Sequence, residues 1–166
     1  VPTPDGRRGL VVESAEGIVE LVQYGVVELH TWGSRYPRLD RPDRLTIDLD
    51  PGARVKWPAI VEAAQFVRER MRAAGLTAFL KTTGGRGLHV VAPLQPRAGW
   101  DDVLAFAREF ANDLVVAPPR IFVTRLARQG RSGHILVDYL RNGLAASAVS
   151  AWSVRARPGA PVAVPM

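Results

Sequence analysis

Hydrophobic and polar residues alternate with a period of two along residues 45–49, which predicts a β-strand. One side of this strand is apolar and the other is polar, with Leu45, Ile47 and Leu49 on the first and Thr46, Asp48 and Asp50 on the second. The dipeptide Pro51-Gly52 then predicts a turn. The strand therefore has one face suited to a core and one face that presents two carboxylates.

Helical periodicity marks three other segments. The longest begins at Pro58, which suits the first helical position, and ends before Gly75. Its apolar positions are Ile60, Ala63, Ala64, Val67 and Met71. A second helix is predicted to begin at Asp101, with apolar positions Val103, Leu104, Phe106, Ala107 and Phe110. A short first helix, capped by Ser14 and ended by Gly25, is predicted to turn inward Ile18, Leu21 and Val22.

Further strands are predicted at residues 26–30, 77–81, 87–92, 121–125 and 135–140. Residues 31–44 form a long connection rich in arginine, residues 125–133 form an arginine-rich hairpin, and the tail after Trp152 is expected to be irregular. The order of elements predicts a single α+β domain over residues 1–166. We expect an RRM-like mixed sheet with two helices on one face and the acidic side chains on the other.

Composition excludes several classes of protein. The chain has no cysteine, so disulfides and thiolate metal sites are excluded. No apolar run approaches the roughly 20 residues that a membrane span requires, and no signal peptide opens the chain. We therefore expect no membrane partner and, by default, a cytoplasmic location.

The charge is basic, with 22 Lys and Arg against 16 Asp and Glu and a formal net charge of +6. Only Lys56 and Lys81 are lysines, and every other basic residue is arginine. The guanidinium fork suits phosphate recognition. Codon bias in a GC-rich genome explains an excess of arginine equally well, so the charge permits a polyanionic partner without demonstrating one.

Three aspartates form a candidate metal site. Asp48 and Asp50 point the same way on their strand, with Cα atoms roughly 6.5 Å apart. The strand at residues 135–140 has Leu136, Asp138 and Leu140 on one face. If the two strands are neighbours, Asp138 joins the same site. Mg²⁺ and Mn²⁺ prefer oxygen ligands, usually carboxylates completed by water and phosphate. Alternatively, Asp50 only caps the turn and Asp138 is an ordinary strand-end residue.

The glycine-rich block over residues 81–89 (KTTGGRGLH) is a candidate phosphate-binding loop. It is neither a P-loop, because the closing Gly-Lys-Ser/Thr is absent, nor a dinucleotide fingerprint, because a strand follows it. Its glycines allow backbone N–H groups to converge on an anion. Thr83 adds a hydroxyl, Arg86 adds a fork, and His89 is expected on the polar face. The alternative is a tight hairpin with incidental basic residues.

Together, the segments HTWGSRYPRLDRPDRLTIDLDPG, KTTGGRGLHVVAPL, VDYLRN and SVRARPGAPV resemble the polymerase domain of bacterial DNA ligase D, in the archaeo-eukaryotic primase superfamily. The resemblance covers the chain from about Val11 to Met166 and implies the catalytic core of the primase fold. It also implies templated addition of nucleotides to DNA ends in non-homologous end joining, with a preference for ribonucleotides and manganese. DNA ends and a nucleoside triphosphate are the implied partners, with Ku and a ligase module as candidates.

The resemblance assigns roles residue by residue. It implies two divalent ions, Mn²⁺ or Mg²⁺, on Asp48, Asp50 and Asp138, and nucleotide contacts by His30, Thr83, Arg86, Arg131 and Arg155. His89, expected on the same polar face, completes the predicted nucleotide-binding residues. The resemblance also implies a bacterial, nucleoid-associated protein. Spacing alone would not have singled out His30, Arg131 or Arg155. Thr31 stands where the family has proline, and Thr83 where it usually has serine.

The family's domain also has a long segment before the helix predicted after Ser14, and a C-terminal extension. The resemblance therefore predicts a catalytic core without them. The expected function is a two-metal nucleotidyltransferase. The alternatives are a core that binds nucleotide, metal or DNA ends but is inactive alone, and a metal-dependent phosphohydrolase.

Overall fold

The computed structural model describes residues 1–124 and 131–166, and its centre is a five-stranded sheet. The strands are β2 (Arg44–Pro51), β3 (Phe79–Thr82), β4 (Leu88–Pro93), β5 (Phe122–Val123) and β6 (Ile135–Asp138). They follow the order β3-β4-β2-β6-β5, in which β5 and β6 run parallel and the other neighbours antiparallel. The predicted mixed sheet is confirmed, with the acidic strand β2 at its centre.

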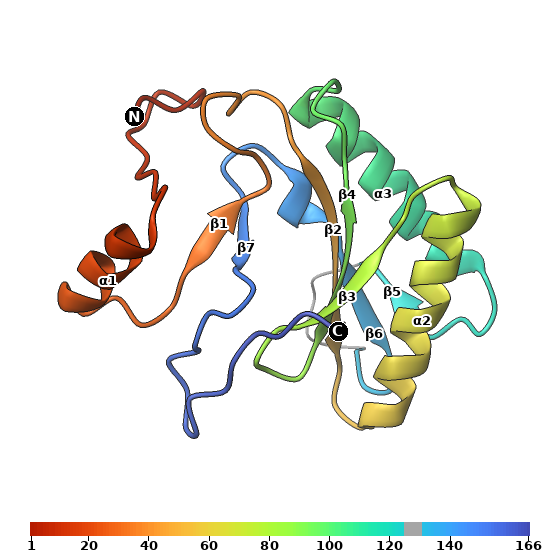
Figure 1. Cartoon of the computed structure of the whole chain (residues 1–166). Helices are drawn as coiled ribbons and strands as arrows, with labels where there is room; N and C mark the ends of the chain where they lie inside the picture. The colour runs from red at the N-terminus through yellow and green to blue at the C-terminus, as the bar shows by residue number, and fades with distance from the viewer. Residues whose placement is uncertain (125–130) are drawn as a thin grey trace.

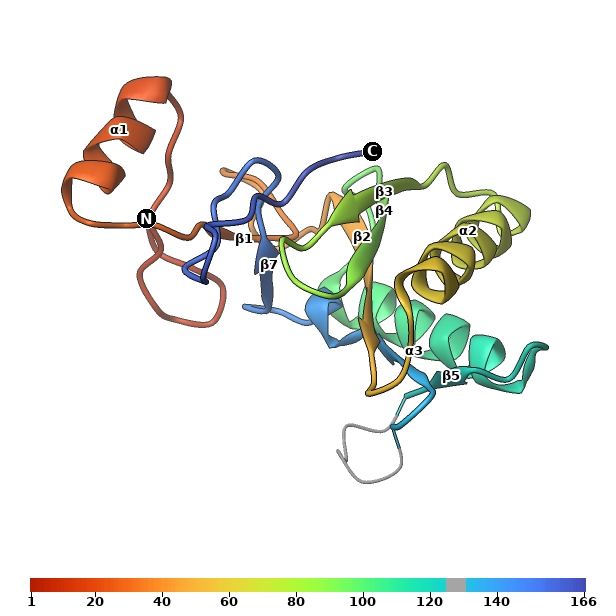
Figure 2. The same cartoon turned by 90° about the horizontal axis from the view of Figure 1, so that it is seen from below.

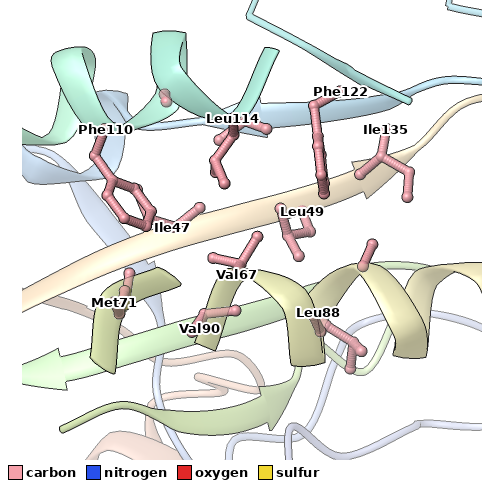
Figure 3. Packing of buried hydrophobic residues seen from close by; sticks show 14 of the residues in the cluster. Ile47, Leu49, Val67, Met71, Leu88, Val90, Phe110, Leu114, Phe122 and Ile135 are labelled. Carbon is pink, nitrogen blue, oxygen red and sulfur yellow. The ribbon is translucent and has the colours of Figure 1, made fainter. Parts of the chain in front are cut away.

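Two long helices, α2 (Trp57–Ala73) and α3 (Trp100–Val116), cover one face of this sheet (Figure 1). All five apolar positions predicted for α2 are buried. They pack against the apolar face of β2 and against α3 (Figure 3), where Val67 lies near Leu49. Full burial of a side chain such as Ile60, Val67 or Met71 stabilises the fold by about 1.5–3 kcal/mol. In α3, which begins one residue earlier than predicted, Phe106 is exposed and Leu104 only half-buried.

A small second sheet lies over the opposite face of the five-stranded one (Figures 1 and 2). It pairs β1 (His30–Trp32) with β7 (Ser147–Val149) in antiparallel register, so that His30 faces Val149. The predicted strand at residues 26–30 is wrong in position, since the observed strand begins where the predicted one ends. The strand β7 was not predicted. Three-residue strands have too little alternation for a period to be recognised.

The first helix, α1 (Ala15–Gln23), forms as predicted but does not pack as predicted. Ser14 caps it, its Oγ accepting a hydrogen bond from the Gly17 N–H at 3.2 Å. No residue of α1 is buried, and Ile18 and Val22 are 46% and 59% exposed. Figures 1 and 2 show the helix standing away from both sheets. The prediction that Ile18, Leu21 and Val22 face inward is therefore wrong, because a helical period encodes an apolar side but not its partner.

The strand β6 is shorter than predicted. It ends at Asp138, whose Oδ1 accepts a hydrogen bond from the Leu140 N–H at 2.9 Å. That side-chain contact turns the backbone into a short 3₁₀ helix, η1 (Leu140–Asn142), so the prediction that Leu140 shares a strand face with Asp138 is wrong. Residues 125–130 of the predicted arginine-rich hairpin, and the end of the predicted strand 121–125, lie outside the described residues.

The C-terminal segment is irregular, as predicted, and runs beside β3. The Thr82 N–H donates to the Val164 carbonyl at 2.8 Å, and the Met166 N–H donates to the Leu80 carbonyl at 2.9 Å. This segment also lies against the loop between β3 and β4, where Pro161 and Val162 approach Gly84. Over the described residues, no helix is long and apolar enough to cross a membrane.

Candidate functional site

A row of polar side chains crosses the sheet on the face away from α2 and α3. In the strand register, Asp48 on β2 faces His89 on β4 on one side and Asp138 on β6 on the other. Lys81 on β3 extends the row beyond His89. Asp50 follows Asp48 on the same face of β2. The prediction that the strand of Asp138 neighbours that of Asp48 is confirmed, and pairing of β2 with β4 brings His89 to the same place.

Arg141, which sequence analysis did not single out, lies between two of the aspartates. Its Nε is 3.2 Å from Asp48 Oδ2 and 3.3 Å from Asp138 Oδ2. Its position is fixed by the next residue, because the Asn142 side chain donates to the Thr46 carbonyl at 2.7 Å and accepts from the Thr46 N–H at 2.8 Å. No local pattern marked this residue, because the three-residue spacing that brings side chains together on a helix does not do so at the end of a predicted strand.

The pKa values of Asp48 and Asp50 shift in opposite directions. Burial raises the pKa of Asp50 above its ordinary value, and the negative charges of Asp48 and Asp138 raise it further. Burial opposes ionisation of Asp48 too, but contact with His89 and the charge of Arg141 lower its pKa overall. The His89 Nε2 lies 3.4 Å from Asp48 Oδ2. Mutual repulsion among close carboxylates shows that these side chains form one electrostatic unit.

The donor set fits a hard divalent cation. In the part of the chain that the structure describes, Asp48 Oδ1 is buried without a hydrogen-bond partner, and such an atom is costly unless a ligand satisfies it. Carboxylate oxygens are the ligands that Mg²⁺ and Mn²⁺ prefer. No three Asp, Glu or His side chains of the described residues already form a cage for an ion. In this structure the guanidinium of Arg141 supplies the positive charge between Asp48 and Asp138.

The glycine block forms a tight loop that joins the antiparallel strands β3 and β4. The Thr83 hydroxyl donates to the Gly87 carbonyl at 3.1 Å and accepts from the Gly85 N–H at 3.2 Å. A Cβ at Gly87 would lie 2.5 Å from the Leu49 carbonyl oxygen, so only glycine lets the loop press against β2. At Gly84 the backbone is left-handed, with φ +65°, and a Cβ would collide with Arg155.

These elements surround a cavity of about 210 Å³. It is lined by His30, Asp48, Asp50, Thr83, Gly85, Arg86, His89, Arg141, Ala148, Val149, Arg155 and Arg157. Five of the six predicted nucleotide-binding residues and two of the three predicted metal-binding residues are among them. Asp138 stands behind Arg141, outside the lining. Arg131 also lies outside it, with its backbone carbonyl against Gly52.

Glu28 is a second residue that sequence analysis did not find. Its Oε1 lies 2.6 Å from His30 Nε2 and 2.9 Å from Arg155 Nε, and its Oε2 accepts from the Ala156 N–H at 2.9 Å. The contact with His30, followed by those with Ala156 and Arg155, lowers the pKa of Glu28 to about 2. Its separation of 127 residues from Arg155 left no signal in the sequence.

Lys81, at the end of the polar row, joins the two sheets, since its Nζ donates to the Val149 carbonyl on β7. Burial, together with the nearby charge of Arg44, lowers the pKa of Lys81 to about 8. The lysine therefore holds a charge in a partly desolvated position beside the cavity.

Comparisons with known proteins identify relatives of this chain. The sequence model of the family described as "LigD, primase-polymerase domain" matches residues 3–166. The multifunctional non-homologous end joining protein LigD of Pseudomonas aeruginosa is 45% identical over 157 residues. The non-homologous end joining DNA repair protein LigD of Mycobacterium tuberculosis is 29% identical over 163 residues. The structure of the polymerase domain from M. tuberculosis ligase D in complex with DNA is similar, with a TM-score of 0.87 at 28% identity.

The matched regions differ in extent. They cover 95% of this chain but 19% of the P. aeruginosa protein, and 93% of this chain but 22% of the M. tuberculosis protein. In the structural comparison, 93% of this chain matches 57% of the polymerase domain. The chain thus spans about a fifth of the length of these curated relatives.

Proposed function

Because the chain belongs to the family of LigD primase-polymerase domains, we propose that it is a nucleotidyltransferase that adds nucleotides to the 3′ ends of DNA. The supporting observation is that Asp48 and Asp50 share one cavity with His30, Arg86 and Arg155. Acidic groups suited to divalent cations and basic groups suited to phosphate thus meet on one face of the sheet. Polymerisation needs both kinds of group at the same phosphate.

Asp48, Asp50 and Asp138 are the proposed ligands of two divalent ions, Mn²⁺ or Mg²⁺. Metal ions bound there would activate the 3′-hydroxyl and neutralise charge on the leaving pyrophosphate. For these ions to bind between Asp48 and Asp138, Arg141 must give up its contacts with both carboxylates. Its side chain is 38% exposed, so it can turn toward the cavity and meet phosphate there.

Basic side chains would bind the triphosphate. Arg86 and Arg155 both line the cavity and offer guanidinium forks, one from the glycine loop and one from the C-terminal segment. His30 comes from β1, on the second sheet. We propose Arg131 as a further contact, following the family resemblance. Catalysis would then rest on positioning and on charge stabilisation by fixed groups.

DNA ends are the proposed polymer substrate. The matching M. tuberculosis polymerase domain was solved with DNA, and the relatives are named for non-homologous end joining. We propose that this chain likewise binds DNA and acts in non-homologous end joining. This proposal includes a role in DNA repair with Ku and a ligase module as partners.

Primer extension tests the proposal. The substrate is a short duplex with a gap or an overhang, supplied with Mn²⁺ and each NTP and dNTP in turn. We expect templated extension by the wild-type chain, and at least about a 10³-fold loss for Asp48→Ala and Asp138→Ala, because each removes a ligand needed for transition-state charge stabilisation. Asp113→Ala changes an exposed carboxylate on α3, on the far side of the sheet, and should leave extension unchanged.

Three outcomes would contradict the proposal. Retained extension in Asp48→Ala would show that the carboxylate is not needed. Binding of ATP by the wild-type chain without extension of any primer would favour the alternative of a nucleotide-binding core. Release of inorganic phosphate without extension would instead indicate a phosphohydrolase.

A further inference from the structure

We infer that Glu28 is a positioning residue, which holds His30 and Arg155 in place to bind the triphosphate. The inference rests on the proposed function, since it assumes that the cavity binds a nucleoside triphosphate. Glu28 does not itself line the cavity, whereas His30 and Arg155 do. The Glu28 carboxylate therefore lies outside the cavity and contacts two side chains that line it, His30 and Arg155.

The contacts of Glu28 use both of its oxygens. Oε1 meets His30 Nε2 at 2.6 Å and Arg155 Nε at 2.9 Å, while Oε2 accepts from the Ala156 N–H at 2.9 Å. Because the pKa of Glu28 is lowered to about 2, the carboxylate is ionised at neutral pH and only accepts hydrogen bonds. It therefore fixes which nitrogen of His30 carries a proton, and it neutralises Arg155, whose side chain is only 12% exposed.

Arg155 is held on a second side as well. Its Nη1 donates to the Thr83 carbonyl in the glycine loop. Glu28 faces Nε as an ion pair at 2.9 Å, while the Thr83 carbonyl accepts a hydrogen bond from Nη1, so two of the three guanidinium nitrogens have a partner that sets the plane of the fork. The remaining donors can serve a ligand. Glu28 thus joins the segment before β1 to the C-terminal segment, and Arg155 extends this connection to the glycine loop.

The position of Glu28 is itself rigid. The next residue, Leu29, accepts a hydrogen bond from the Ser150 N–H at 2.9 Å and donates to Ser153 Oγ at 2.8 Å. These bonds fix the backbone beside Glu28 to the chain that follows β7. Groups held in this way lose little conformational entropy when a ligand binds, which favours tight binding.

A competing role predicts the opposite effect. If Glu28 merely occupied His30 and Arg155 in place of phosphate, its removal would free them and strengthen nucleotide binding. A purely architectural role would change stability while leaving the affinity of the folded protein unaltered. The affinity for nucleotide therefore separates the three roles.

The test is isothermal titration of the full chain with ATP and Mn²⁺ in the absence of DNA. We expect Glu28→Gln, which keeps the shape but removes the charge, to weaken ATP binding about 5- to 20-fold, the size of a lost charge-assisted hydrogen bond. In primer extension the same variant should raise KM for the nucleotide by a similar factor and change kcat less than about twofold. Glu20→Gln, the same change on the exposed surface of α1, should alter neither.

A double variant isolates the mechanism. In an Arg155→Gln background, Glu28→Gln should weaken ATP binding by a smaller factor than it does in the wild-type chain, because Glu28 acts partly through Arg155. Near-UV circular dichroism confirms the fold, and if Glu28→Gln does not fold, Glu28→Asp takes its place in the same titration. Unchanged or tighter ATP binding by a folded variant would overturn the inference, as would fully additive effects.

The inference and the proposed function fail in different ways. A wild-type chain that binds ATP but extends no primer refutes the proposed function, while the titration still tests Glu28. A wild-type chain that binds no ATP overturns both.

Discussion

Arg141 faces two carboxylates on neighbouring strands, an arrangement that balances charge in the absence of bound cations. Without its guanidinium, Asp48 and Asp138 would face each other directly across β2 and β6. Repulsion between them would oppose folding, and a divalent cation would relieve it. If the site binds metal as proposed, we expect Arg141 to couple the stability of the fold to that binding.

Arg141→Gln tests this coupling. In the presence of a chelator we expect the free energy of unfolding of this variant to be about 1 kcal/mol lower than that of the wild-type chain, with a Tm about 2–4 °C lower. The loss is modest because solvent partly screens the interaction of Arg141 with the two carboxylates. Adding Mn²⁺ should raise the Tm of Arg141→Gln more than that of the wild-type chain, since the ion no longer displaces a guanidinium. Arg68→Gln, on the exposed side of α2, is the control. An equal response to Mn²⁺ in both proteins would contradict the coupling.

Lys81 predicts a pH dependence of stability. Its pKa falls from 10.5 to about 8 on folding, so between these values the unfolded chain binds more protons than the folded one. The free energy of unfolding should then rise as the pH increases from about 8 to 10.5, and the contribution of Lys81 should be flat below pH 8. Urea titrations at several pH values should show this rise, and Lys81→Met should reduce its slope. Parallel curves for the two proteins would refute the prediction.

The site could be predicted in part because some of its chemistry is local. Spacing alone places Asp48 and Asp50 on one face of a strand. The glycines of residues 84–87 predict a loop between two strands. Asp138 required the additional expectation that its strand pairs with β2. Glu28 and Arg141 act through partners that tertiary structure brings near, 127 residues away in the case of Arg155, and no local pattern encodes such a contact.

At the scale of elements, α1 and α2 differ in packing far more than in pattern. Both have an apolar side with helical spacing, and both have recognisable ends. The difference is that α2 covers the apolar face of the sheet, whereas α1 contributes no buried residue. Periodicity therefore predicts a helix reliably, but the depth of its burial depends on what lies opposite.

Matched isoleucines measure this difference. Ile60→Ala in α2 removes a side chain that is 1% exposed, and we expect a loss of about 2–5 kcal/mol from transfer and cavity terms. Ile18→Ala in α1 should change the stability of this chain by no more than about 0.5 kcal/mol. Chemical denaturation gives both values. Similar losses at the two positions would show that α1 packs more deeply than the structure indicates.

The strands also differ in how well the sequence predicts them. The strands β2 and β4 were located within one or two residues, β2 from its alternation and β4 from its apolar run beside the glycine block. The pair β1 and β7 is held instead by mutual hydrogen bonds and by Lys81, which donates from β3 to Val149. Their formation is a property of the assembled sheets, and this explains why one was misplaced and the other was not predicted.

At the scale of the whole molecule, the net charge of +6 and the arginines around the cavity favour binding to a polyanion. We expect affinity for duplex DNA ends to fall more than about tenfold between 50 and 200 mM salt, because binding releases counterions from phosphate. Fluorescence anisotropy at several salt concentrations measures the slope. A duplex with an uncharged methylphosphonate backbone should show little dependence on salt. A flat response with natural DNA would contradict an electrostatic mode of binding.

The C-terminal segment has a consequence for colloidal behaviour. An unpaired sheet border is a template on which a second chain can add a strand, and such borders promote aggregation. At one border, β5 is only two residues long. At the other, the bonds from Thr82 to Val164 and from Met166 to Leu80 occupy the backbone groups of β3. Residues 164–166 thus cover the edge of β3 and prevent another chain from pairing with it. If this segment were detached, we expect the protein to aggregate as fibrils or to precipitate.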